Sequence, residues 1–232
     1  MEIKEYIRQN PYPGRGIFVG LCEDGSQAVL AYFITGRSEN SKNRVLVSDG
    51  DGAITKAFDE SKVSDPSLIF YSPVRVFNGR TVISNGDQTD TIVSFLEQGK
   101  TFDEALQTRE EEPDAPHYTP RISAIVDTKD KLSCRFSILR REDGETVREF
   151  TEYNEFEEGF GRLLHTYAGD GSPLPSFTGE PKLLCFSGKK IVSDLWEELG
   201  KDRRVALWVR TVDLATGATE TTIRNRYEEG NA

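Results

Sequence analysis

The sequence predicts an α+β fold, because many short β-rich runs alternate with a small number of helical blocks. Turn residues typical of antiparallel hairpins join several of these runs, among them Asp24-Gly25 and Asp143-Gly144. The sequence contains no internal repeat and no long linker rich in Pro, Gly or Ser. We therefore expect residues 1–232 to form a single domain.

The expected strands are runs of apolar and β-branched residues bounded by turn residues. They lie at residues 16–22, 28–36, 44–49, 67–86, 121–127, 132–141, 145–150, 182–188 and 205–227. Two of these segments are long enough for a hairpin, with turns at Asn78-Gly79 and Thr216-Gly217. The strands thus predict mostly antiparallel sheets.

Amphipathic periodicity predicts helices over residues 90–99, 154–169 and 193–200. In the second of these segments, large apolar residues repeat at helical spacing: Phe156, Phe160, Leu163, Leu164 and Tyr167. A further short helix is expected after Thr101, which forms the pattern of a capping box with Glu104.

The composition restricts the class of partner. A formal net charge of -10 argues against nucleic acid, so an anionic ligand would need a local basic pocket. Cys22, Cys134 and Cys185 are widely spaced and fit neither a disulfide framework nor a zinc site. With neither a basic-then-apolar leader nor an apolar run of about 18 residues, we expect a soluble cytoplasmic protein without a membrane partner.

The polar segment 35–44 concentrates hydrogen-bond donors after a predicted strand. Arg37 and Arg44 there could belong to a solvated loop with surface ion pairs, or they could clamp a phosphate or carboxylate. Arg15, placed between two glycines, could add a third cation. Neutral donors nearby are Ser38, Asn40, Ser41 and Asn43.

Two other polar segments each allow a structural and a functional interpretation. Residues 84–90 could simply cap the next helix through Asp87, Thr89 or Asp90, or they could present Asn85 and Gln88 to a ligand. Residues 112–122 combine carboxylates with a cation, and acid-base chemistry favours such a pairing of Glu112 with Arg121. We interpret His117 as structural.

Residues 165–181 form a Pro-rich loop in which Tyr167 and Asp170 could face a ligand. The sequence carries no phosphate-binding fingerprint of the Walker or Rossmann type and no GxSxG elbow. With two histidines in the chain, metal ligands are scarce. Neither ATP, a dinucleotide nor a metal is therefore expected.

Several segments taken together resemble the archaeal-type IMP cyclohydrolase family and its bacterial relatives. They are "YPGRG", "TGRSENSKNR", "SNGDQTD", "EPD" followed by "YTPRI", and "GDGSPLPSFTGEP", in family order. The resemblance implies a four-layer αββα sandwich like that of N-terminal-nucleophile hydrolases, without their usual chemistry. The chain begins with Met1 and Glu2, so its first residue supplies no such nucleophile.

The resemblance also implies an enzyme that acts on carbon–nitrogen bonds of cyclic amidines. It would close 5-formamidoimidazole-4-carboxamide ribonucleotide (FAICAR) to inosine monophosphate (IMP) with loss of water, the last step of purine biosynthesis. No cofactor is implied, because the formyl group is already attached. We expect a homo-oligomer, with a tetramer as the expected form.

The expected catalytic residues are Glu112 for proton transfer, Arg121 or Arg37 for oxyanion charge, and Tyr71, with Asn85, for orienting the heterocycle. The remaining expected substrate-binding residues are Arg15, Ser38, Asn43, Arg44, Gln88 and Asp170. Two alternatives remain open at this point: a non-catalytic regulatory protein that binds purine nucleotides, and an amidohydrolase that uses a cysteine on a linear amide. The chain departs from the family pattern in the leading segment "MEIKEYIRQN" and in a longer C-terminal half, and both departures bear on oligomeric contacts and fine specificity.

Overall fold

The computed structural model describes residues 1–63 and 70–228 and contains two antiparallel sheets. Six strands of the described residues form the first sheet, in the order β11-β10-β1-β2-β12-β13. Their bounds are β1 Arg15–Leu21, β2 Gln27–Thr35, β10 Phe160–His165, β11 Lys182–Cys185, β12 Arg204–Asp213 and β13 Thr219–Asn225. The mixture of many strands with few helices confirms the α+β class.

Within the described ranges, the second sheet has seven strands in the order β3-β4-β5-β6-β7-β8-β9. Their bounds are β3 Val45–Asp49, β4 Gly52–Lys56, β5 Val74–Phe77, β6 Arg80–Ser84, β7 Arg121–Asp127, β8 Ser133–Glu142 and β9 Glu145–Tyr153. The β5–β6 and β8–β9 hairpins turn where the sequence predicts. Asn78 and Gly79 have φ of 51° and 80°, as a tight two-residue hairpin turn requires.

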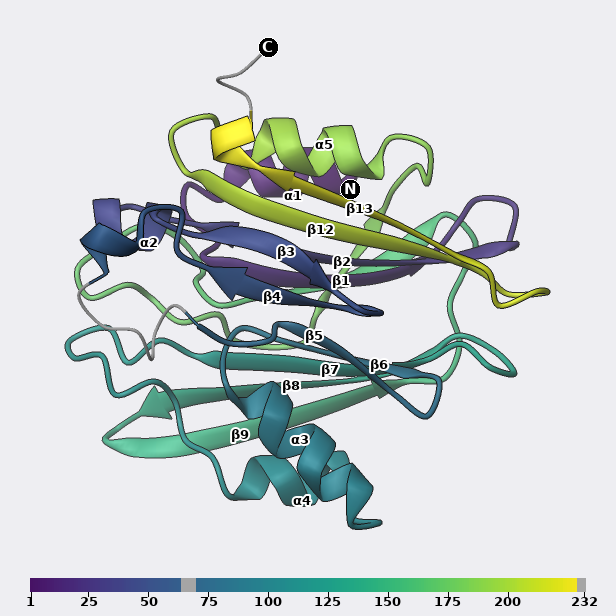
Figure 1. Ribbon diagram of the computed structural model, residues 1–232, viewed down its shortest axis with the longest axis horizontal. Helices are drawn as coiled ribbons and strands as arrows, with labels where there is room; N and C mark the ends of the chain where they lie inside the picture. Colours follow the sequence, from purple (N-terminus) through teal and green to yellow (C-terminus); the bar gives the residue numbers. More distant parts are fainter. Residues whose placement is uncertain (64–69, 229–232) are drawn as a thin grey trace.

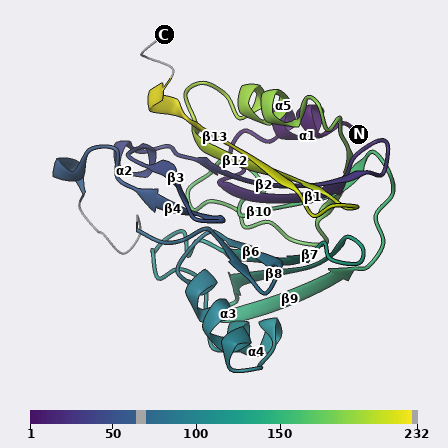
Figure 2. The ribbon, with the colours of Figure 1, turned by 45° about the vertical axis from the view of Figure 1, so that its right-hand side comes forward.

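Helices lie on the outer faces of both sheets (Figure 1). These helices are α1 Ile3–Gln9, α3 Gln88–Glu97, α4 Phe102–Gln107 and α5 Ile191–Glu198. Helix α2 Glu39–Lys42 lies instead at the strand ends, and short 3-10 turns are present at Glu60–Lys62 and Arg226–Glu228. Helices α1 and α5 cover the first sheet, and α3 and α4 cover the second. Figure 2 shows the same succession of helix, sheet, sheet and helix from a second direction.

The central core lies between the two sheets. Strand β2 shows why the sequence "AVLAYFIT" is apolar at every position but the last. Leu30, Tyr32 and Ile34 pack against the second sheet, whereas Ala31 and Phe33 pack against α1 and α5. A strand covered on both faces needs apolar residues throughout rather than alternation.

The helix expected over residues 154–169 is wrong, because Phe160–His165 is strand β10. Leu163 faces the helix-covered core and Leu164 faces the core between the sheets. The apolar neighbours that imitate a helical face therefore belong to the two buried faces of an internal strand.

Other differences are smaller. Helix α1 and strand β4 are present although the sequence analysis expected neither. The start of the strand segment 67–86, at residues 67–69, lies outside the described residues. No helix in the described ranges is long and apolar enough to cross a membrane.

His165 connects helix α1 to the loop after β10. Its ring is 1% exposed, its Nδ1 donates to the Tyr167 carbonyl oxygen at 3.0 Å, and its Nε2 accepts from the Tyr6 hydroxyl at 2.8 Å. Burial lowers the pKa of His165 to about 4. The neutral imidazole is therefore part of the folded structure.

We expect His165 to make stability depend on pH. In the unfolded chain a histidine titrates near pH 6.5, so below that pH the unfolded state binds a proton that the folded state excludes until about pH 4. The free energy of unfolding should therefore lose about 3 kcal/mol from this residue between about pH 6.5 and pH 4, and nothing above that range.

Urea unfolding of the wild type and of His165→Gln across this pH range measures the contribution. The free energy of unfolding of the variant should decline less steeply with falling pH than that of the wild type. Equal pH slopes for wild type and His165→Gln would contradict the expectation.

Candidate active site

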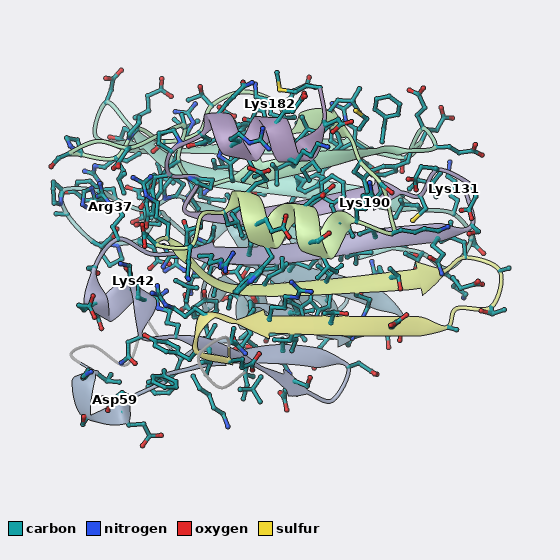
Figure 3. All side chains as sticks on the ribbon, turned by 90° about the horizontal axis from the view of Figure 1, so that it is seen from above. Arg37, Lys42, Asp59, Lys131, Lys182 and Lys190 are labelled. Carbon is teal, nitrogen blue, oxygen red and sulfur yellow. The ribbon has the colours of Figure 1, made fainter. Side chains whose placement is uncertain are left out.

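A cavity of about 460 Å³ lies where strand ends of both sheets meet. The first sheet contributes the start of β1, the segment after β2 and the loop after β10; the second contributes segments before β5, after β6 and before β7. Figure 3 places Arg37 and Lys42 at this end of the molecule, away from Lys131 and Lys190. The cavity therefore requires both sheets.

The cavity brings together many of the side chains expected from the sequence. The expected residues that line it are Arg15, Arg37, Ser38, Arg44, Tyr71, Asn85 and Glu112. It is also lined by Tyr12, Ser41, Gly86, Asp87, Asp114, His117, Thr119, Tyr167 and Leu174. Tyr12 and Thr119 had no expected role, although both lie inside motifs that the sequence analysis singled out.

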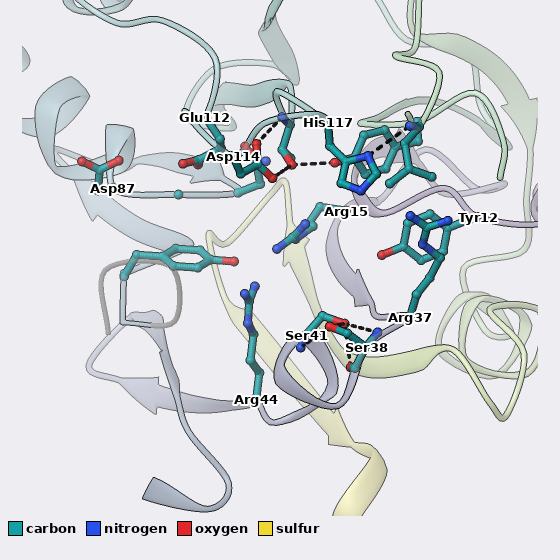
Figure 4. A pocket seen from close by; sticks show the side chains of 16 residues that line it. Tyr12, Arg15, Arg37, Ser38, Ser41, Arg44, Asp87, Glu112, Asp114 and His117 are labelled. Atoms are coloured by element: carbon teal, nitrogen blue, oxygen red, sulfur yellow. Dashed lines mark hydrogen bonds between the residues drawn. The ribbon is translucent and has the colours of Figure 1, made fainter. Parts of the chain in front are cut away.

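Arg15 and Arg44 point into the cavity toward one another (Figure 4). Arg44 is 4% exposed, and its Nε and Nη1 are buried without a hydrogen-bond partner among the described residues. The Nε of Arg15 is likewise buried without a hydrogen-bond partner among the described residues. Burial, together with the nearby charge of Arg15, lowers the pKa of Arg44. Arg44 is buried and Arg15 is half-buried, and neither has a carboxylate partner among the described residues. Two adjacent cations in this state favour an anionic ligand between them.

Arg37 is already paired. Its Nη1 lies 2.6 Å from Asp170, which also contacts Arg203 at 3.2 Å, and its guanidinium lies 5.1 Å from the Tyr12 ring centre. Burial acts to raise the pKa of Asp170, but the hydrogen bonds from Arg37 and the Gly171 N–H, together with the charges of Arg37 and Arg203, lower that pKa overall. Asp170 does not line the cavity and instead neutralises arginines beside it.

The segment 35–44 is shaped by a four-residue helix, α2. Ser38 and Ser41 form a capping box, in which each side chain accepts from the other residue's backbone N–H. Asn43 lies outside the cavity lining, because its amide is used in hydrogen bonds of 2.8 Å with the backbone N–H and carbonyl of Asp59. This local order directs Arg44 inward.

Glu112 lines the cavity, and its carboxylate pairs with Arg121, which lies outside the cavity lining. The Arg121 Nη2 donates to Glu112 Oε2 at 3.1 Å, and Nη1 lies 3.0 Å from Oε1. Burial raises the pKa of Glu112, although the charges of Arg121 and Arg15 act in the opposite direction. Arg121 itself does not line the cavity, and its side chain is 9% exposed.

Asn85 and Gln88 hold the loop that precedes α3. Asn85 Oδ1 accepts from the Ile122 N–H at 2.8 Å and from Gln88 Nε2 at 3.0 Å, and its Nδ2 donates to the Pro120 carbonyl at 2.9 Å. Gln88 is 0% exposed and lies outside the cavity lining. The geometry gives both amides a structural use in the loop.

Asp87 stands at the N-cap of α3, but its side chain makes no capping hydrogen bond. Its Oδ1 instead accepts from Arg109 at 2.5 Å and from Arg121 at 2.7 Å. The N-cap residue is thus one of the three that the sequence offered, although its carboxylate does not bond to the helix N–H groups. The carboxylate is drawn away by two arginines, whose charge-assisted hydrogen bonds are stronger than those of a neutral N–H.

A chain of hydroxyl groups lies on another wall. Thr119 Oγ1 donates to Asp114 at 2.5 Å, so it accepts from the Tyr167 hydroxyl, also at 2.5 Å. Burial raises the pKa of Tyr167 to about 12, which keeps this phenol protonated. His117 Nδ1 accepts from the Leu174 N–H at 3.2 Å, which assigns the ring proton to Nε2.

The described residues contain no group of three or more His, Cys, Asp or Glu that could hold a metal ion. What the cavity offers is a basic part around Arg15 and Arg44 beside an acidic part around Asp87, Glu112 and Asp114. It can bind an anion and place a carboxylate of raised pKa next to it.

Comparisons with known proteins agree with the resemblance. A family model described as "IMP cyclohydrolase-like protein" matches residues 12–217. The chain is similar to the IMP cyclohydrolase of Methanopyrus kandleri, with 31% identity over 180 residues that cover 72% of this chain and 89% of that protein.

Two further archaeal relatives also carry the name IMP cyclohydrolase. The Methanothrix thermoacetophila protein is 28% identical over 173 residues, which cover 72% of this chain and 80% of that protein. The Methanocaldococcus jannaschii protein is 28% identical over 158 residues, which cover 67% of this chain and 73% of that protein. The family match extends over most of the chain and includes every segment that lines the cavity, so this protein belongs to the IMP cyclohydrolase-like family.

Proposed function

We propose that the cavity is the active site of an IMP cyclohydrolase, which converts FAICAR to IMP with loss of water. The family and the relatives named IMP cyclohydrolase support this activity. The structural observation that carries the proposal is the pair of arginines, Arg44 buried and Arg15 half-buried, that point into the cavity and have buried N–H groups without a partner among the described residues. A ribonucleotide phosphate would supply the missing anion.

The charges of the cavity suggest the orientation of the substrate. A phosphate dianion is repelled by Asp87, Glu112 and Asp114, so we place it between Arg15 and Arg44. The hydroxyls of Ser38 and Ser41 line the same cavity and offer neutral contacts. The imidazole ring with its two substituents then lies toward Glu112.

Glu112 is the proposed proton-transfer group. One proton leaves the carboxamide nitrogen as that nitrogen attacks the formyl carbon, and a carbon–nitrogen bond forms. A second proton then leaves the formamide nitrogen as the formyl carbon–oxygen bond breaks, and both protons depart with the oxygen as water. A carboxylate of raised pKa suits such transfers near neutral pH.

Positioning supplies another part of the rate. Both reacting groups belong to one imidazole, so holding them face to face makes the attack intramolecular. Tyr71 is 7% exposed, and its hydroxyl shares a hydrogen bond of 2.9 Å with the hydroxyl of Tyr32. Burial and this bond fix the Tyr71 ring, which we propose orients the heterocycle. Arg121 acts through Glu112, because its guanidinium donates to the Glu112 carboxylate.

The proposal also covers the fold relationship and the assembly of the protein. The order of helix, sheet, sheet and helix supports a relationship to the N-terminal-nucleophile hydrolase fold. We also propose that residues 1–232 act as one domain in a cytoplasmic homo-oligomer of four subunits, for which the family resemblance is the support.

The alternative of a cysteine amidohydrolase loses its support. Cys22, Cys134 and Cys185 are absent from the residues described as lining the cavity. Burial raises the pKa of Cys22 to about 11 and that of Cys134 well above its usual value, so both thiols stay protonated. Turnover that survives thiol alkylation would settle this point, and turnover itself would exclude a protein that only binds nucleotides.

Arg44→Met tests the anion site. Loss of one charge-assisted contact to phosphate should raise KM for FAICAR about 10-fold to 100-fold while kcat changes much less. The ligand-free variant should melt no lower than the wild type, because a buried unpartnered charge has been removed.

Cyclisation is followed by ultraviolet absorbance, and melting by circular dichroism. The control Arg8→Met removes an arginine that is 63% exposed and paired with Glu198, and it should leave KM unchanged. An unaltered KM in Arg44→Met would place the phosphate elsewhere.

The raised pKa of Glu112 predicts where activity is lost in acid. The carboxylate must be ionised to accept a proton, so kcat should fall as pH drops through a pKa above the ordinary value of 4.5. Saturating substrate is used because a phosphate itself titrates near pH 6. Glu112→Gln should lower kcat about 10²-fold to 10⁴-fold and abolish this acid limb. If the limb persisted in the variant, another group would be the base.

A further inference from the structure

Asp87 lies at the solvent-facing wall of the cavity and accepts a hydrogen bond from the buried guanidinium of Arg121. Its side chain is 54% exposed, whereas the side chains of Arg121 and Glu112 are 9% and 14% exposed. One oxygen, Oδ1, accepts from both Arg109 and Arg121. This carboxylate is therefore held in place from two sides, although it caps no helix.

Arg121 connects Asp87 to Glu112 through hydrogen bonds. Its Nη1 donates to Asp87 Oδ1 and to Gln88 Oε1, each at 2.7 Å, and its Nη2 donates to Glu112 Oε2 at 3.1 Å. A guanidinium is planar, so two acceptors on Nη1 define the plane in which Nη2 meets Glu112.

The backbone of Gly86 limits movement on the other side. A Cβ at this position would lie 2.8 Å from Arg121 Nη1 and 2.9 Å from Glu112 Oε1. The arginine and the carboxylate are thus packed directly against a residue without a side chain. This contact and the hydrogen bond to Asp87 therefore restrict where the Arg121 guanidinium and the Glu112 carboxylate lie at the cavity wall.

We propose that Asp87 is a positioning residue for the cyclisation, because it holds Arg121 in the plane that turns the Glu112 carboxylate toward the substrate. The inference rests on the proposed function, in which Glu112 transfers the protons. The charged groups that act on Glu112 come from four elements: Arg15 on β1, Arg121 on β7, Asp87 before α3 and Asp114 on the segment of Glu112 itself.

Removal of the Asp87 charge acts on Glu112 in two ways with the same sign. A nearby negative charge is lost, and Arg121 no longer divides its charge between two carboxylates. Both changes favour the ionised form of Glu112, so its pKa should fall. The orientation of the carboxylate is relaxed at the same time.

Asp87→Asn tests the proposal, with Asp90→Asn as a matched control. Asp90 is also an exposed carboxylate near the start of α3, but it pairs with Arg75 at 2.7 Å. In Asp87→Asn we expect kcat to fall about tenfold, KM to stay within about twofold, and the acid limb of kcat to move to lower pH. Asp90→Asn should match the wild type in all three quantities.

A second measurement does not depend on turnover. The side-chain carboxyl carbon of Glu112, assigned by its loss in Glu112→Gln, is titrated by ¹³C NMR in wild type and Asp87→Asn. A lower titration midpoint in Asp87→Asn supports the action of Asp87 on Glu112. This result is independent of turnover, so it stands even if the wild type fails to cyclise FAICAR and the proposed function is overturned. An unmoved acid limb and an unmoved midpoint in Asp87→Asn would overturn the inference.

Discussion

Face-to-face packing of the two sheets is the constraint on which the site depends. Arg15 starts a strand of one sheet, whereas Arg121 starts a strand of the other and Glu112 lies in the segment that precedes that strand. Tyr32 shows the coupling directly, because its ring is buried between the sheets and its hydroxyl bonds to Tyr71 at the cavity. A change in the spacing of the sheets would therefore separate the cations from the proposed base.

The cavity joins two kinds of electrostatic environment. On one side of Glu112, hydrogen bonds connect Arg109 to Asp87, Asp87 to Arg121 and Arg121 to Glu112. Between Arg15 and Arg44, buried N–H groups have no partner among the described residues. A folded protein retains such unpaired charge at a cost in stability, and binding of an anionic substrate would offset that cost.

Local patterns predicted the fold well where they acted alone. The hairpin turn at Asn78-Gly79 and the capping box of Thr101 lie where expected, since both depend on a few adjacent residues. Strand β10 was mistaken for a helix because adjacent leucines can satisfy either a helical face or a strand buried on both sides. The second buried face of this strand packs against segments that are distant in sequence, and the local periodicity holds no information about them.

The sequence by itself determined the α+β class, the family resemblance and most of the residues around the cavity, because its polar motifs follow strand ends directly. The tertiary structure alone decided their chemical state. Arg37 and Arg44 lie seven positions apart in one motif, yet one is paired with Asp170 and the other is buried without a partner for its Nε and Nη1 among the described residues. The partner of Arg37 comes from a loop 133 residues away in sequence, so the distinction between a paired and an available cation appears only when the sheets are packed.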